Sequence, residues 1–206
     1  MNANCKLRRQ RGFSLVELLV VVAIIFIASG MAIIGYVSQL DNNRANSAAY
    51  TISGALRAAR QAAITNRRDV QVWIDQTFTG GDNVQHVNYQ IQPKLGIAEP
   101  AHDIVSFELP TQTQYQVFAG VPDTPMAFGN SAAVYINGQS GGPNTMAFAS
   151  DGSFNNGLAS QAPASPISGT IFVGIPNKTN TARAVTIMGG TGRVRTYTWT
   201  GTQWAE

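Results

Sequence analysis

An unbroken apolar run near the start of the chain is the strongest pattern in the sequence. Residues 13–37 read FSLVELLVVVAIIFIASGMAIIGYV and carry a single charge, on Glu17. About 20 apolar residues span a bilayer as a helix, so the run predicts a transmembrane helix. A cleavable signal peptide would have a shorter apolar region, and this run continues past Ala28-Ser29-Gly30, the one stretch that imitates a cleavage site.

The helical pattern continues beyond the apolar run but becomes amphipathic. Between residues 38 and 66, small and apolar residues recur at spacings of three and four, whereas Arg57, Arg60 and Gln61 fall between them. The apolar positions are Ala48, Ala49, Ile52, Ala55, Leu56, Ala59, Ala62, Ala63 and Ile64. Alanine is the best helix former, so one helix is expected from about Ser14 to about Asn66. Its Ala-rich face should pack closely against a sheet.

From Asp69 onward the period of the pattern changes to two, which is typical of strands. Val70, Val72 and Ile74 alternate with polar neighbours, and Gly- and Pro-rich stretches separate the later candidates. These candidates are 86–92, 103–109, 114–118, 132–136, 145–149, 170–175, 183–188 and 192–199. The predicted fold is therefore α+β: a long N-terminal helix packed against the antiparallel sheet of a β-rich head, residues 67–206.

The charge distribution assigns the basic character of the chain to its N-terminus. The net charge is +3, and Lys6, Arg8, Arg9 and Arg11 precede the apolar run without an acidic residue. Residues 38–206 hold ten basic and ten acidic residues, so the chain beyond the apolar run is not a basic domain of the nucleic-acid-binding type. The excess of positive charge before the run predicts a cytoplasmic N-terminus, with the rest of the chain outside the cytoplasmic membrane. The single cysteine, Cys5, allows no intramolecular disulfide.

The residues that could carry catalysis or bind a metal are few. His86 and His102 are the only histidines, and a metal site needs three or four ligands. Residues 151–157, DGSFNNG, lack the spacing and the final Glu of a calcium loop, and a tight turn is expected there. No nucleophile elbow, phosphate-cradling loop or paired-carboxylate motif is present. We therefore predict no enzymatic activity, no cofactor and no metal.

The last predicted hairpin concentrates positive charge. Arg193 and Arg195 alternate with Val194 and should share a strand face with Tyr197 and Trp199, with Lys178 and Arg183 nearby. Arginines beside aromatic side chains suit contact with DNA, and these four basic residues are the predicted DNA-binding residues. The other interpretation is that the aromatic side chains belong to the core and the arginines form a solvated strand end.

Residues 11–21, RGFSLVELLVV, closely resemble the class III leader of type IV pilins and type II secretion pseudopilins. The resemblance implies a leader peptide at residues 1–12, cleavage by a prepilin peptidase between Gly12 and Phe13, and N-methylation of Phe13. Residues 13–37 would remain as the transmembrane and filament-core helix, with residues 38–66 as its amphipathic half. Glu17, the fifth mature residue, would then serve assembly with other pilin subunits, because its buried carboxylate needs a cation such as the Phe13 amine of a neighbour.

Later segments resemble the GspH/FimT family of minor pilins and pseudopilins. They are residues 55–64, 66–70, 148–153, 183–188 and 192–195, whereas residues 80–139 resemble nothing familiar. The resemblance implies a minor pilin of a type IV pilus, with a role in DNA uptake, or a minor pseudopilin of a type II secretion system. The leader does not separate these two. The net charge of zero over residues 38–206 disfavours a stand-alone DNA-binding module.

Overall fold

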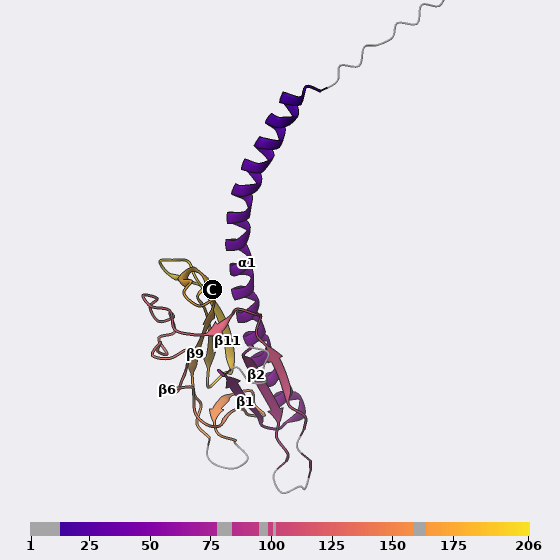
Figure 1. Ribbon diagram of the computed structural model, residues 1–206. Helices are drawn as coiled ribbons and strands as arrows, with labels where there is room; N and C mark the ends of the chain where they lie inside the picture. The colour runs from indigo at the N-terminus through magenta and orange to yellow at the C-terminus, as the bar shows by residue number, and fades with distance from the viewer. Residues whose placement is uncertain (1–12, 78–83, 95–98, 101, 159–163) are drawn as a thin grey trace, which may run out of the picture. The chain divides into compact units, whose positions relative to one another are not determined.

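The computed structural model describes residues 13–77, 84–94, 99–100, 102–158 and 164–206, without the side chains of residues 31–35. The chain divides into two compact units, residues 1–40 and 41–206. A single helix, α1 (Leu15–Asn66), runs through both, close to the predicted bounds (Figure 1). The predicted leader, residues 1–12, lies outside the described residues.

The first unit contains the apolar part of α1. Its large apolar side chains are exposed within this unit, and Phe13, Leu15 and Phe26 each expose at least three quarters of their surface. Among the described residues, no helix combines the length and the hydropathy that a membrane crossing requires.

The second unit, the head, contains two antiparallel sheets where the sequence predicted one. The first has the strand order β3-β2-β1-β7-β8. Its strands are β1 (Val70–Asp75), β2 (His86–Ile91), β3 (Val105–Glu108), β7 (Met146–Phe148) and β8 (Phe154–Asn156). Strands β1 and β2 pair over their full length, with Val72 opposite Tyr89, and β7 covers the other edge of β1.

The second sheet has the order β12-β11-β10-β9-β5-β6, with β4 also paired to β9. Its strands are β4 (Gln114–Tyr115), β5 (Val134–Ile136), β6 (Gln139–Ser140), β9 (Gly169–Gly174), β10 (Arg183–Met188), β11 (Arg193–Trp199) and β12 (Trp204–Ala205). A short 3-10 helix, η1 (Thr179–Thr181), lies between β9 and β10. Strands β9, β10 and β11 pair in simple antiparallel register, with Ala184 opposite both Phe172 and Tyr197.

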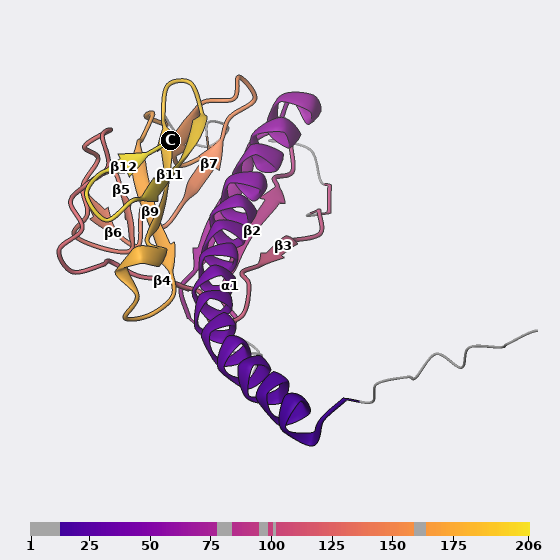
Figure 2. The same cartoon turned by 90° about the horizontal axis from the view of Figure 1, so that it is seen from above.

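The main core lies between α1 and the two sheets. The helix contributes a face of mostly small residues, each at most 1% exposed: Ala45, Ala48, Ala49, Ile52, Ala55, Leu56, Ala59 and Ala63. From Ala48 onward, these side chains pack in one cluster with Val70 and Phe148 of the first sheet and Ile171 and Val185 of the second. In Figure 2, β2 and β3 appear on one side of α1, and β9 and β11 appear on the other. The predicted packing of the Ala-rich face is confirmed.

A smaller apolar layer covers the opposite face of the second sheet. Phe172, Ala184 and Tyr197 point to this face and pack against Met126 and Trp204. Trp199 packs beside them with Phe118 and Val121. Residues around 118–126 belong to the segment 80–139, which resembles no familiar family. They therefore cover this outer face of the second sheet.

Candidate functional site

The residues of the N-terminal motif lie at the start of α1. Phe13 is exposed, and Gly12 lies outside the described residues. Glu17 is the acidic residue of the first helical turn, and its side chain is exposed. Within the described part of the chain, Glu17 forms no salt bridge.

Arg183, one of the four predicted DNA-binding residues, is part of the structural framework of the head. Its side chain is buried, and its Nε donates a hydrogen bond of 2.6 Å to Oδ1 of Asn46 on α1. Its other nitrogens donate to Oδ1 of Asn42 at 3.4 Å and to the carbonyl oxygen of Ala182 at 2.9 Å. Burial lowers the pKa of the Arg183 guanidinium. With its donors satisfied inside the protein, this arginine fastens β10 to α1.

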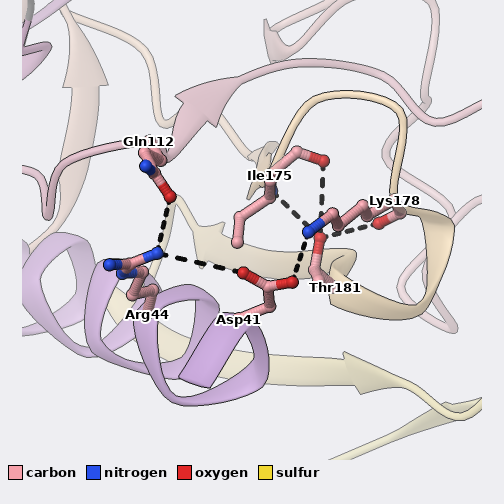
Figure 3. A network of polar contacts seen from close by, with 6 residues as sticks. All are labelled: Asp41, Arg44, Gln112, Ile175, Lys178 and Thr181. Atoms are coloured by element: carbon pink, nitrogen blue, oxygen red, sulfur yellow. Dashed lines mark hydrogen bonds and ion pairs between the residues drawn. The ribbon is translucent and has the colours of Figure 1, made fainter. Parts of the chain in front are cut away.

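Lys178 is held in a second polar network, which we call the Asp41 clamp (Asp41, Arg44, Gln112, Ile175, Lys178 and Thr181; Figure 3). The Lys178 ammonium pairs with Asp41, and Arg44 lies 3.9 Å from the same carboxylate. Arg44 also donates to Oε1 of Gln112 at 2.5 Å. The Thr181 hydroxyl donates to the carbonyl oxygen of Lys178 at 2.6 Å and accepts the Ile175 amide at 3.0 Å. The clamp therefore joins the turn of α1 that begins at Asp41, the first residue of the second unit, to the loop between β9 and β10.

Arg193 and Arg195 lie on β11, as predicted, but the aromatic residues beside them are not accessible. Tyr197 and Trp199 expose 3% and 8% of their surface and belong to the smaller apolar layer on the opposite face of the second sheet. They therefore offer no free ring for base stacking. Arg193 is exposed, and Arg195 pairs with Glu206 at 2.9 Å. A hydrogen bond to the Tyr197 hydroxyl, and then the Glu206 carboxylate, raise the pKa of Arg195. For Tyr197 and Trp199, the interpretation as core residues is confirmed.

A groove beside β11 brings together basic residues that are distant in sequence. Its lining, which we call the arginine groove, is Tyr50, Arg57, Arg193, Val194, Arg195, Thr196, Thr198 and Glu206. Arg57 comes from α1 and donates to the carbonyl oxygen of Val194 at 3.3 Å, which fixes the helix against the strand. In the sequence, Arg57 falls among the polar positions of the helix, and that pattern did not mark it as part of a site.

The segments that resemble the GspH/FimT family meet near the end of α1. Arg60 Nε donates to the carbonyl oxygen of Gly152 at 3.1 Å, in the turn between β7 and β8. A Cβ atom on Gly192, in the turn between β10 and β11, would lie 2.0 Å from that same oxygen. Gly152 and Gly192 both have positive φ, at 84° and 60°. Helix and turns are therefore packed too closely at this point for any side chain at position 192.

The turn predicted around Asp151 is present. The carboxylate of Asp151 accepts the Ser153 amide at 2.8 Å and the Ser153 hydroxyl at 2.6 Å. The Ser153 hydroxyl is the main cause of the lowered pKa of Asp151. Strand β8 begins directly afterwards, at Phe154, inside residues 151–157, where only a turn was expected.

The two histidines lie apart from the arginine groove. His102 is exposed near Arg68, which pairs with Glu99 at 2.5 Å, and His86 lies in β2. The Arg68 hydrogen bond is the main cause of the lowered pKa of Glu99. Over the described residues, no group of three His, Cys, Asp or Glu side chains is arranged to hold a metal ion.

The N-terminal segment matches a known family model, the prokaryotic N-terminal methylation motif, over residues 7–33. Comparisons of the chain with curated proteins and with solved structures gave no match. The motif and the α+β fold of a long helix packed on antiparallel sheets support a type IV pilin-like protein. Such a leader implies processing by a prepilin peptidase and assembly with other pilins.

Proposed function

We propose that the chain is a minor pilin of a type IV pilus and belongs to the GspH/FimT family. The observation that carries this proposal is that the methylation motif leads directly into a helix whose apolar side chains are uncovered within their own unit. Exposed apolar surface of this extent needs lipid or other apolar helices around it. A subunit that is stored in the membrane and then assembled into a filament meets both requirements.

The proposed subunit is anchored in the bacterial inner membrane by residues 13–37, with a cytoplasmic N-terminus and a periplasmic head. Prepilin peptidase cuts between Gly12 and Phe13, and the new amine of Phe13 is methylated. Glu17 then pairs with the Phe13 amine of a neighbouring subunit, because a carboxylate among packed apolar helices is stable only beside a cation.

Processing is the direct test of this assignment. In cells with a prepilin peptidase, Gly12→Asp should leave a full-length precursor, because Gly has no side chain to clash at the cut. Gln10→Asp adds the same charge two residues earlier and serves as the matched control. The mature N-terminus is read by mass spectrometry, which also reports methylation of Phe13. Normal cleavage of the Gly12→Asp precursor would overturn the proposed cleavage site.

We further propose that the head contacts DNA weakly through the arginine groove, as a minor pilin that acts in DNA uptake would. The supporting observation is that Arg57, Arg193 and Arg195 line one groove. Lys178 and Arg183 are not part of this lining and are held by Asp41 and Asn46. Because Tyr197 and Trp199 are buried, the β11 side of the groove would contact phosphates and would show little sequence preference. Three neutralised phosphates predict a slope of about −2.7 in log affinity against log salt concentration.

The alternative function is a minor pseudopilin of the GspH type, which needs no DNA contact. A gel-shift titration of the full chain and of its Arg193→Gln/Arg195→Gln variant separates the two functions. The variant is needed because the leader also carries four basic residues, which attract phosphates. Equal shifts for both proteins at low salt would favour the secretion pseudopilin.

A further inference from the structure

We propose that Glu206 is a built-in competitor of DNA at the arginine groove, occupying Arg195 until a phosphate displaces it. This inference rests on the DNA contact proposed above. It concerns how that site is regulated, and it assigns a function to β12 and the residue after it.

Strand β12 is attached to the head independently of the ion pair. Trp204 and Ala205 pair with Trp199 and Thr198 of β11. The Trp204 ring lies 5.4 Å from that of Trp199, centroid to centroid, and its Nε1 donates to the carbonyl oxygen of Pro122 at 2.9 Å. The turn before β12 is closed by a hydrogen bond of 3.0 Å from the Thr200 amide to the Gln203 carbonyl oxygen. Glu206 is therefore held beside β11 even when its side chain has no partner.

The carboxylate of Glu206 takes the position of a ligand anion. Its Oε2 lies 2.9 Å from Nη1 of Arg195, and both residues line the groove. In the described part of the chain, Arg57 and Arg193 form no salt bridge with a carboxylate. A DNA backbone entering the groove therefore finds two arginines without an anionic partner and a third that is already paired.

The Arg195–Glu206 pair is accessible enough to be exchanged. The Glu206 side chain is 53% exposed and the Arg195 side chain 29%, so water reaches both partners. Ion pairs at the surface are weak, and a phosphate can replace the carboxylate at small cost. The carboxylate also repels the incoming phosphates. Both effects weaken DNA binding at a groove that would otherwise present three arginines without an anionic partner.

The test is a double-mutant cycle on the full chain, purified in a non-ionic detergent, with a 24-base-pair duplex of random sequence as the probe. Glu206→Gln removes the charge but keeps the shape of the side chain. We expect it to raise DNA affinity about two- to fivefold, the range that corresponds to a surface ion pair. The log–log salt slope should stay at about −2.7, because a phosphate displaces the carboxylate in the unmutated complex as well and three phosphates are neutralised in both proteins. In the Arg195→Gln background, the same substitution should change affinity far less.

Glu108→Gln is the matched control, because it makes the same charge change on an exposed residue of β3, in the other sheet. It should leave affinity almost unchanged, and circular dichroism should show that every variant is folded. If Glu206→Gln and Glu108→Gln have equal effects, or if the effect persists without Arg195, Glu206 is not a competitor. If the full chain and its Arg193→Gln/Arg195→Gln variant bind DNA equally, the proposed DNA contact itself fails.

Discussion

At the scale of single residues, the head distinguishes glycines that the fold requires from those that it does not. Gly192 has positive φ and faces the Gly152 carbonyl oxygen, whereas a Cβ atom on Gly54, in the middle of α1, would meet nothing within 4 Å. The same substitution should therefore have opposite effects at the two positions.

Gly192→Ala should destabilise the head by at least about 1–2 kcal/mol, the cost of the left-handed conformation alone. The clash with Gly152 adds to that cost. Gly54→Ala should stabilise the head by about 0.8–1.0 kcal/mol, because alanine favours the helix and gains no bad contact. Urea unfolding of the two variants measures both effects. A stable Gly192→Ala head would mean that the two turns are farther apart than described here.

Arg183 and Arg193 provide a second pair with opposite expected effects. Arg183→Gln should lower the free energy of unfolding by about 1.5–3 kcal/mol, because hydrogen bonds from a charged group to Asn46 and Ala182 are lost. It should leave DNA binding by the folded protein nearly unchanged. Arg193 is exposed, so Arg193→Gln should leave the free energy of unfolding nearly unchanged and should weaken DNA binding. A loss of DNA binding without a loss of stability for Arg183→Gln would restore Arg183 to the DNA site.

At the scale of elements, α1 is one helix whose two parts need different surroundings. Its first part is apolar and uncovered within its own unit, and its second part buries one face of small residues against two sheets. Folding of the head uses only the second part. Changes in the first part should therefore affect assembly rather than the stability of the head.

Glu17→Leu tests this separation. It should leave the unfolding transition of the head unchanged, because Glu17 lies outside the core. Recovery of partner pilins in a pull-down should fall, because the proposed cation of the neighbouring subunit loses its carboxylate. Val16→Leu, an adjacent apolar change, is the control. An unchanged pull-down with Glu17→Leu would show that Glu17 does not set the register between subunits.

The elements could be predicted from sequence wherever the pattern is local. The helix bounds follow from the spacing of its apolar residues, and β1 follows from the alternation of Val70, Val72 and Ile74. Strands β6, β8 and β12 were missed because they have only two or three residues and follow strong turn signals. The division into two sheets depends on pairing between β1 and β7, which lie far apart in the chain. No local pattern specifies that pairing.

The candidate site was predicted less completely for the same reason. Arg183 resembles a free cation at a strand end, and its partner Asn46 lies 137 residues earlier in the sequence. Arg57 resembles a solvated helix position, and its contact with Val194 spans the same separation. The charge of a residue is visible in the sequence, but the partner that uses this charge is fixed only by the tertiary fold.

At the scale of the whole molecule, the head has the properties of an independent domain. Its core begins at Ala45, and residues 41–206 have equal numbers of basic and acidic residues. We therefore expect residues 41–206 to fold alone as a monomer with a single cooperative unfolding transition. The transition should not respond to a reductant, because Cys5 is absent from this fragment. Size-exclusion chromatography and urea titration test this, and a fragment that only aggregates would contradict it.

The Asp41 clamp also determines where tension on α1 enters the head. Asp41 is the first residue of the second unit and pairs with Lys178, while Arg183 holds Asn46 on the next helical turn. Lys178 lies in the connection between β9 and β10, Arg183 is the first residue of β10, and each of these strands has partners on both of its edges. A pull on the helix is therefore delivered to the interior of the larger sheet. The edge strand β12 pairs with β11 at the rim of the same sheet and lies off this load path.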